Sequence, residues 1–184
     1  MLPKTILLDQ AQIAERVADL GARVRAHFAD RWEDVRVVGL LRGAVFFFVD
    51  LVRAMGSPEV AIDLMRASSY ADSLDAAATT DATTSAGRVQ FDERMVPTDI
   101  RGQRVVLVDD IIDTGRTLQT LHETLLRAGA AEVVTVVLLD KPSRREVPFQ
   151  ADFVGFEIPD AFVVGYGLDH GGRFRCLPDI RVVE

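Results

Sequence analysis

The sequence predicts an α/β fold with a mostly parallel, doubly wound sheet in a single domain. Short aliphatic runs alternate along the chain with segments whose apolar residues recur every three or four positions. Buried strands alternating with amphipathic helices produce this pattern. The 184 residues, 48% of them hydrophobic, are enough for one substantial core. We expect one domain over residues 1–184, with a small hood formed by the two chain termini.

The first half of the chain supplies two helices and two strands. Residues 9–28 predict an amphipathic helix that starts near Asp9 or Gln10. Residues 35–41, VRVVGLL, predict a buried strand, and residues 44–55 predict a largely buried helix ended by Gly56. Residues 60–70 predict a second strand. The apolar face of the first helix consists of Ile13, Val17, Leu20, Val24 and Phe28.

The second half continues the alternation after a polar interruption. Residues 71–90 are rich in Ala, Thr, Ser and Asp, and a connection of this length is either functional or a passive solvated loop. Residues 104–108 and 132–142 predict parallel strands on either side of a helix over 117–129. Residues 151–159 and 162–167 predict two further short strands. The helix carries an apolar stripe of Leu118, Leu121, Leu125 and Leu126.

Composition and missing motifs exclude several classes of protein. The net charge of −7 argues against a broad nucleic-acid surface, and no apolar run is long enough to cross a membrane. Cys176 is the single cysteine, so no intrachain disulfide can form, and we expect a cytoplasmic protein. The three histidines lack zinc-site spacing, and no Walker A, G-x-S-x-G or G-x-G-x-x-G motif occurs.

The stretch VVLVDDIIDTGRT, residues 105–117, contains the strongest functional signal. Asp109 and Asp110 leave a buried strand at its carboxyl end, where ligands bind in open α/β sheets. Asp113 and the residues TGRT then lead into a helix, whose N-terminus favours a phosphate. Carboxylates beside a phosphate cradle suit sugar hydroxyls or a cation, so the pattern suggests a phosphorylated sugar. The alternative is that these acids only cap the helix and form a turn.

These residues resemble the 5-phosphoribosyl-1-pyrophosphate (PRPP) motif of the type I phosphoribosyltransferases. Four further stretches resemble the hypoxanthine-guanine phosphoribosyltransferases, in order from about residue 35 to the C-terminus. They are VGLLRGAVFFFVDLVR, DLMRASSY, LLDKPSRREV and ADFVGFEIPDAFVVGYGLDHGGRFRCLPDI. The resemblance implies the type I phosphoribosyltransferase fold and a purine-salvage enzyme. Such an enzyme makes IMP or GMP from hypoxanthine or guanine and PRPP, releases pyrophosphate and depends on Mg²⁺.

The resemblance also implies which residues bind PRPP. Asp109 and Asp110 match the acidic pair that holds the ribose hydroxyls and their Mg²⁺, although the family usually has Glu at the first position. The 5′-phosphate loop corresponds to Thr114, Gly115, Arg116 and Thr117. Arg42 and Gly43 match the pyrophosphate loop, where the family often has a cis peptide bond, here Leu41–Arg42. Asp169 matches the ligand of a second Mg²⁺ and Arg175 a pyrophosphate-side cation, while His170 replaces the usual Tyr.

For the purine, the resemblance implies a catalytic residue and three binding residues. Asp113 matches the general base near purine N7, a role that contributes roughly a hundred- to ten-thousand-fold. Lys141 matches the donor to the purine O6, and a group with donors only favours a carbonyl over the amino group of adenine. Phe162 matches the aromatic ring that stacks on the base, and Val163 the main chain that reads its edge.

The resemblance extends to a lid and to an assembly. Ser69 and Tyr70 match the pair on the mobile loop that closes over the reacting centre and excludes water. We expect a homodimer or homotetramer, with no nucleic-acid or membrane partner. The preference among hypoxanthine, guanine and xanthine stays open, because base choice depends on backbone positions and ordered water.

Two other classes share part of the central motif. An RNA-binding regulator on the same fold has a similar loop but an aromatic residue at the position of Asp113 and a basic face, which the net charge of −7 disfavours. A signalling receiver domain has an acidic pair on its first strand and a separate phosphoacceptor strand before its lysine. Here one helix and one strand separate Asp110 from Lys141, so we disfavour that class as well.

Overall fold

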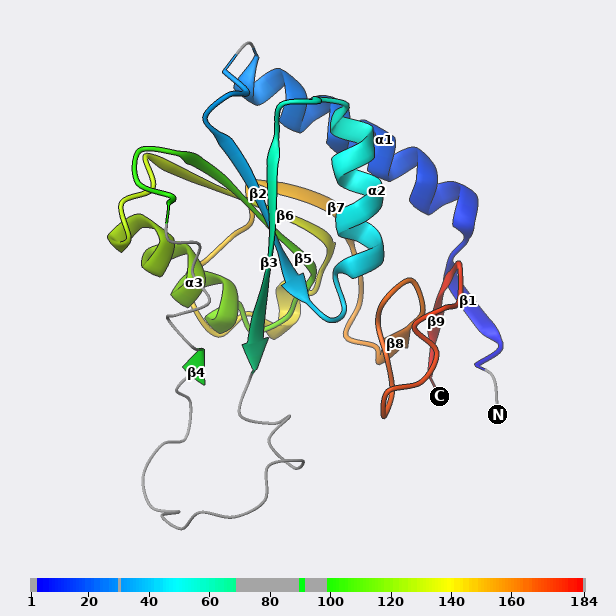
Figure 1. Ribbon diagram of the computed structural model, residues 1–184. Helices are drawn as coiled ribbons and strands as arrows, with labels where there is room; N and C mark the ends of the chain where they lie inside the picture. Colours follow the sequence, from blue (N-terminus) through cyan, green and yellow to red (C-terminus); the bar gives the residue numbers. More distant parts are fainter. Residues whose placement is uncertain (1–2, 30, 69–89, 92–98, 184) are drawn as a thin grey trace, which may run out of the picture.

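The computed structural model describes residues 3–29, 31–68, 90–91 and 99–183. These residues form a six-stranded sheet in the order β4-β3-β2-β5-β6-β7 (Figure 1). Five neighbouring strands are parallel, and only β4 runs antiparallel to its neighbour β3 within the described part of the chain. The strands are β2 (Val35–Leu41), β3 (Ala61–Ser68), β4 (Gln90–Phe91), β5 (Arg104–Ile112), β6 (Glu132–Asp140) and β7 (Phe153–Glu157).

Helices cover both faces of this sheet. The helices α1 (Gln10–Phe28) and α2 (Val45–Met55) lie on one face, and α3 (Arg116–Arg127) lies on the other (Figure 1). Side chains alternate along a strand, so Val106 and Val108 join the core under α1 and α2. Val105 and Leu107 join the second core, under α3. The predicted doubly wound sheet is therefore confirmed.

Local sequence explains where α1 begins and where α2 ends. The Asp9 side chain accepts a hydrogen bond from the Gln12 backbone at 2.8 Å, and the Gln12 side chain accepts one from the Asp9 backbone at 2.9 Å. This capping box starts α1 at the predicted place. Gly56 ends α2 in the left-handed conformation, with φ of 64°. A side chain at Gly21 would lie 2.5 Å from the Ala54 Cβ, so glycine is what lets α1 pack closely on α2.

The two chain ends build a small antiparallel sheet in the order β1-β9-β8. Its strands are β1 (Thr5–Leu8), β8 (Val163–Val164) and β9 (Ile180–Val182). The Arg181 guanidinium donates two hydrogen bonds of 2.7 Å to Asp179 and a third, of 3.0 Å, to the Pro3 carbonyl. The Tyr166 hydroxyl donates to Asp50 of α2 at 2.7 Å, which attaches this sheet to the main domain. The predicted hood of the chain termini is present.

Two expectations about burial need correction. The helix over 44–55 is only partly buried, because Phe46 is 41% exposed and Val49 39%. Ile62 and Leu64 of β3 are also exposed, and strand alternation puts them on the α2 side of the sheet, opposite buried Met65. Leu126, predicted in the buried stripe of α3, is 43% exposed because it lies at the edge of that stripe. Among the residues described, no helix is long and apolar enough to cross a membrane.

Candidate active site

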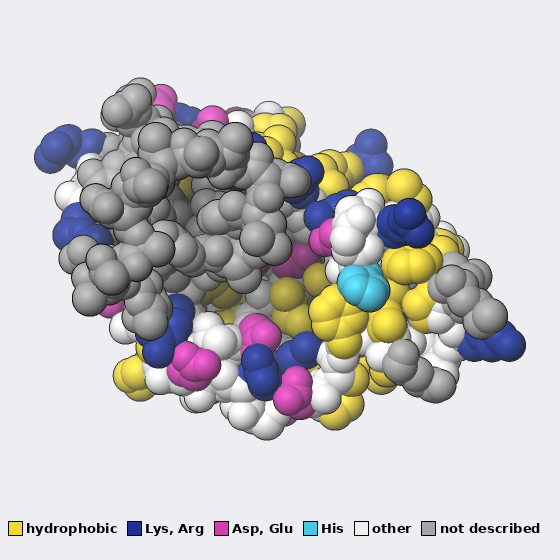
Figure 2. Space-filling model, turned by 90° about the horizontal axis from the view of Figure 1, so that it is seen from below, with side chains coloured by type: hydrophobic (Ala, Val, Ile, Leu, Met, Phe, Trp, Pro, Cys, Tyr) yellow, Lys and Arg dark blue, Asp and Glu magenta, His cyan; other side chains and the backbone are white. Residues whose placement is uncertain are grey.

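The loops that follow β2, β5 and β6 meet at the carboxyl edge of the sheet. These strands are adjacent and parallel, so the segments after them leave the sheet on the same side. Figure 2 views the molecule from this edge and shows acidic and basic side chains mixed around a hollow. The residues predicted to act on a substrate are concentrated in these loops and in the hood.

The acidic pair lies directly against the loop after β2. A Cβ added at Gly43 would lie 1.8 Å from Oδ2 of Asp110, so only glycine permits this contact. The peptide bond between Leu41 and Arg42 is cis, as predicted. A Cβ added at Gly167 would in turn lie 2.0 Å from the Gly43 carbonyl oxygen. Gly43 therefore packs between the Asp110 side chain of β5 and the backbone of the hood at Gly167.

The two carboxylates of this pair are partly withdrawn from water, because Asp110 is buried and Asp109 is half-buried. Burial raises the pKa of Asp109 well above its ordinary value, and the neighbouring Asp110 carboxylate raises it further. Burial also raises the pKa of Asp110, against a lowering by hydrogen bonds and by the charge of Arg175. Oδ1 of Asp109 accepts a hydrogen bond from the Asp110 backbone at 2.9 Å. A buried acidic pair of this kind favours a cation beside it.

The donor set of this pair fits Mg²⁺. Carboxylate oxygens are its preferred protein ligands, and it is usually bound through one or two carboxylates together with waters and substrate phosphates. Within the described residues, no group of three or more acidic, histidine or cysteine side chains could hold a metal alone. Asp109 and Asp110 therefore suit a metal that arrives with a phosphorylated substrate.

The loop after β5 leads into the N-terminus of α3, where backbone N–H groups can bind an anion. Gly115 is the N-cap residue, with φ of 84°, a conformation that favours glycine. The Thr114 hydroxyl accepts a hydrogen bond of 3.4 Å from the Arg116 backbone. Thr114 and Thr117 are partly exposed, so their hydroxyls can reach a ligand. The positive end of the helix dipole also favours an anion at this position.

The residues predicted to bind the purine lie directly after β6 and in the hood. Lys141 follows β6 directly, is buried, and its backbone donates to the Ile112 carbonyl at 3.0 Å. This hydrogen bond puts Lys141 beside the start of the Asp113 loop. Phe162 is 53% exposed, and its ring meets the His170 ring edge-on with centroids 5.3 Å apart. Val163 is buried in β8, so its backbone is fixed within the hood.

Asp169 and Arg175 contact each other in the hood. An Arg175 guanidinium nitrogen lies 2.6 Å from Oδ1 of Asp169, and the Gly172 backbone donates to Oδ2 at 2.6 Å. Arg175 also donates to the Gly167 carbonyl, next to the point where that loop meets Gly43. The structure thus brings Asp169 and Arg175 close to the loop after β2. Ser69 and Tyr70, the predicted lid pair, lie outside the described residues.

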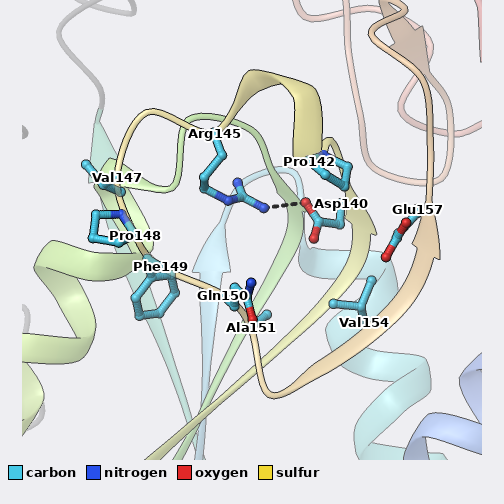
Figure 3. A pocket seen from close by; sticks show the side chains of 10 residues that line it. All are labelled: Asp140, Pro142, Arg145, Val147, Pro148, Phe149, Gln150, Ala151, Val154 and Glu157. Atoms are coloured by element: carbon cyan, nitrogen blue, oxygen red, sulfur yellow. Dashed lines mark hydrogen bonds and ion pairs between the residues drawn. The ribbon is translucent and has the colours of Figure 1, made fainter.

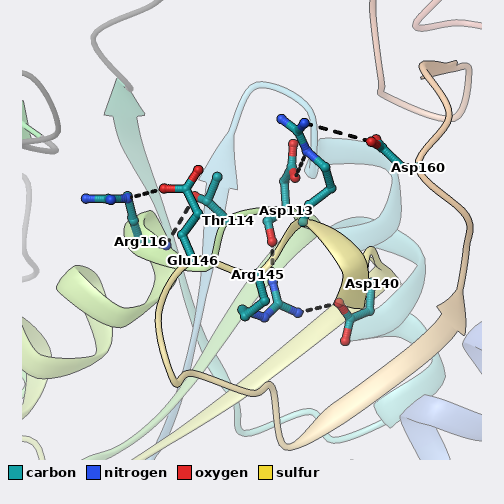
Figure 4. Close-up of polar contacts among 8 residues, drawn as sticks. Asp113, Thr114, Arg116, Asp140, Arg145, Glu146 and Asp160 are labelled. Atoms are coloured by element: carbon teal, nitrogen blue, oxygen red, sulfur yellow. Dashed lines mark hydrogen bonds and ion pairs between the residues drawn. The ribbon is translucent and has the colours of Figure 1, made fainter.

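Sequence reasoning missed the charged residues that follow Lys141. The Arg144 guanidinium lies 3.1 Å from Oδ1 of Asp113, and Arg145 donates to the Asp113 carbonyl (Figure 4). The Glu146 backbone donates to the Thr114 carbonyl at 3.0 Å, and its carboxylate pairs with Arg116 at 2.7 Å. The available signal was the run RRE directly after Lys-Pro at the same sheet edge. Arg144, Arg145 and Glu146 therefore contact the loop over residues 113–116.

A pocket of about 520 Å³ lies between the segment after β6 and strand β7 (Figure 3). The ion pair of Arg145 and Asp140 forms part of its wall, together with Phe149 and with Glu157 of β7. None of the residues predicted from sequence lines it. The candidate active site is therefore the edge formed by the three loops and the hood, and not this pocket.

Comparison with known proteins agrees with this geometry. A family model for the phosphoribosyl transferase domain matches residues 4–170. The hypoxanthine-guanine phosphoribosyltransferase of Aquifex aeolicus is 42% identical over 180 residues, 97% of this chain and 94% of that protein. The hypoxanthine phosphoribosyltransferase of Escherichia coli is 42% identical over 176 residues, 95% of this chain and 92% of that protein.

Solved structures give the same result. The crystal structure of a hypoxanthine-guanine phosphoribosyltransferase from Bacillus anthracis superposes with a TM-score of 0.84 at 34% identity and covers 100% of both chains. A hypoxanthine phosphoribosyltransferase from Staphylococcus aureus also gives a TM-score of 0.84, at 34% identity, over 99% of this chain and 92% of that one. By sequence and by fold, the chain belongs to the hypoxanthine-guanine phosphoribosyltransferases of the phosphoribosyl transferase domain family.

Proposed function

We propose that this chain transfers the phosphoribosyl group of PRPP to hypoxanthine or guanine, makes IMP or GMP, and releases pyrophosphate with Mg²⁺ present. The observation that carries the proposal is the contact between Asp110 and Gly43, which brings the acidic pair of β5 against the loop after β2 at the sheet edge. If these acids only capped the helix or formed a turn, they would not need this contact. The names of the relatives, which share about 40% of their residues with this chain, support the same reaction.

The sugar-phosphate end of PRPP would bind between the acidic pair and α3. The backbone of Thr114, Gly115 and Arg116, with the Thr117 hydroxyl, would take the 5′-phosphate at the helix N-terminus. Asp109 and Asp110 would accept hydrogen bonds from the two ribose hydroxyls, directly or through water. Because these carboxylates are buried, they also lie in a low-dielectric region where negative charge acts strongly on a cationic sugar.

The pyrophosphate end would bind between the loop after β2 and the hood. Arg42 is exposed and Gly43 offers backbone without a side chain in the way, while Arg175 faces them from the hood. Asp109, Asp110 and Asp169 would hold Mg²⁺ on either side of the pyrophosphate. The metal would offset the charge that develops on the leaving group. Arg175 pairs with Asp169 at 2.6 Å, so both are already oriented.

The purine would lie between Lys141 and Phe162. An ammonium group offers donors only, so Lys141 would donate to a 6-oxo oxygen and would disfavour the 6-amino group of adenine. The exposed ring of Phe162 can stack on the base, and the backbone of buried Val163 can read its edge. Lys141 follows β6 and Asp113 follows β5, the adjacent strand, so the two reach one base from neighbouring strand ends.

In the reaction, purine N9 forms a bond to ribose C1′ as the bond from C1′ to the pyrophosphate oxygen breaks. The sugar passes through an oxocarbenium-like state, which the carboxylates of Asp109 and Asp110 stabilise. Asp113 takes the proton that leaves purine N7. Ser69 and Tyr70 would close over this centre and keep water away from the cationic sugar. Pyrophosphate leaves toward Arg42 and Arg175.

We further propose that a second copy of the chain covers the exposed apolar patch of Phe46, Val49, Ile62 and Leu64. These side chains lie on α2 and on the neighbouring strand β3, and such a patch is typical of an interface. Ile62→Lys should convert the assembly to a monomer in sedimentation velocity, while Ile6→Lys, at an exposed position of β1, should leave its mass unchanged. A wild-type monomer would contradict this proposal.

The test of the reaction is an ultraviolet assay with Mg²⁺, PRPP and each of hypoxanthine, guanine, xanthine and adenine. Turnover of 6-oxopurines without turnover of adenine is the expected result, and it ranks the bases as well. Tight nucleotide binding without turnover of any base would reject the enzyme in favour of a regulator on the same fold. Turnover of adenine alone would reject the role given to Lys141.

A further inference from the structure

Arg144 bridges two carboxylates that come from different parts of the chain. It ends the short 3₁₀ helix η3 (Pro142–Arg144), which follows β6. Its Nε lies 3.1 Å from Oδ1 of Asp113, after β5, and its Nη1 lies 3.8 Å from Oδ2 of Asp160, between β7 and β8. These two ion pairs place the guanidinium between Asp113 and Asp160, both of which are labelled in Figure 4. Three segments near the predicted purine position are therefore joined through one side chain.

The Asp113 carboxylate is held at one oxygen and open at the other. Oδ1 accepts from Arg144, whereas Oδ2 has no hydrogen-bond partner among the described residues. The backbone of the same residue is also fixed, because Arg145 donates to the Asp113 carbonyl. A planar guanidinium has a rigid set of donors, so it restricts the orientation of the carboxylate that it binds. The open oxygen is the one available to a substrate.

This ion pair adds little to the stability of the fold. The side chains of Arg144 and Asp113 are 48% and 42% exposed, and ion pairs this exposed contribute little to stability because water screens them. The charged groups facing Arg144 are Asp113, Asp160 and Glu146, all acidic. The hydrogen bond to Asp113 is the main cause that raises the pKa of Arg144, followed by the charges of Asp113 and Asp160, so the side chain stays cationic. An effect on the orientation of Asp113 is what the geometry can provide.

We propose that Arg144 is a positioning residue, which holds Oδ1 of Asp113 so that Oδ2 faces the purine proton, and that Asp160 steadies Arg144 in turn. A general base oriented by a third group is a recurrent arrangement in enzymes. The inference rests on the proposed function, in which Asp113 receives the proton from N7. It assigns a role to the charged residues after Lys141.

The experiment measures kcat and KM with hypoxanthine and PRPP for the wild type, Arg144→Gln, Arg144→Lys, Asp160→Asn, Asp113→Asn and the double variant Asp113→Asn with Arg144→Gln. Arg144→Gln should lower kcat on the order of tenfold, as misorientation of a catalytic group does, with KM for PRPP within about twofold. Arg144→Lys should recover part of that loss, because lysine restores the positive charge but not the planar set of guanidinium donors. The matched control is Arg127→Gln, which breaks a similarly exposed arginine pair on α3.

Non-additivity separates positioning from a merely structural effect. If Arg144 acts through Asp113, then Arg144→Gln changes kcat little once Asp113 is Asn. Full additivity of the two losses would overturn the proposal, and so would wild-type kcat in Arg144→Gln. Absence of turnover by the wild type would instead reject the proposed function itself. Thermal unfolding of Arg144→Gln should match that of Arg127→Gln, and a much lower midpoint would assign Arg144 to the fold and contradict the inference.

Discussion

Replacing Gly43 with alanine should damage catalysis far more than folding. The added Cβ would lie 1.8 Å from Oδ2 of Asp110, whereas ordinary contacts begin at 3.4 Å, so the carboxylate must move by about 1.6 Å. Gly43 has no left-handed backbone conformation, so alanine itself adds no backbone strain. A misplacement near 1 Å in an active site costs on the order of a hundredfold, or about 2.7 kcal/mol in the barrier.

The assay is the initial rate of IMP formation over a range of PRPP concentrations, together with thermal unfolding. We expect kcat/KM for PRPP to fall at least about a hundredfold, while overpacking costs about 1–3 kcal/mol of stability. Gly102→Ala is the control, because Gly102 has φ of 78° and nothing within 4 Å of an added Cβ. It should lower stability by about 1–2 kcal/mol with unchanged activity. Near-wild-type kcat/KM in Gly43→Ala would refute the contact as a determinant of the site.

Three further predictions concern the base, the pH dependence of stability and the core. Lys141→Gln should lower kcat/KM for hypoxanthine roughly a hundredfold. The ratio of kcat/KM for hypoxanthine to kcat/KM for adenine should therefore fall. The hydrogen bond from the Arg181 side chain lowers the pKa of Asp179 in the folded protein below its ordinary 3.8. The ionised Asp179 therefore stabilises the fold above pH 3.8, and this stabilisation is lost as the pH falls through the pKa of the folded state. Urea unfolding should therefore separate Asp179→Asn from the wild type at pH 7 and much less in strong acid, and a gap that does not shrink would contradict this assignment. Leu121→Ala leaves a cavity at a buried position of α3 and should lower the free energy of unfolding in urea by about 2–5 kcal/mol. Leu126→Ala, at a residue that is 43% exposed, should change this free energy by no more than about 0.5 kcal/mol. Equal losses of stability in the two variants would contradict the burial of this face of α3.

The central strands of the sheet were predictable because they are buried on both faces. Residues 35–41 and 104–108 are continuous aliphatic runs, and they form β2 and most of β5. The hood strands β1 and β9 were not predicted as strands, because four and three residues are too short to show an alternating pattern. Their pairing depends on contacts between the two chain ends, such as Arg181 with Pro3, which no local window contains.

The candidate site was predictable where a motif carries several functional groups in one stretch. The segment from Asp109 to Thr117 occupies the sheet edge where the sequence placed it. The contact between Asp110 and Gly43 follows only from the pairing of β2 with β5. The pair of Arg144 with Asp113 was missed because surface ion pairs between segments 31 residues apart leave no periodic signal.

The most direct test of the central claim compares wild type and Asp113→Asn with hypoxanthine, PRPP and Mg²⁺, following IMP and pyrophosphate together. The wild type should form equal amounts of the two products. The kcat of the variant should be lower by roughly a hundred- to ten-thousand-fold, with PRPP binding retained. Wild-type turnover in Asp113→Asn would show that the proton goes elsewhere and would contradict the mechanism built on this sheet edge.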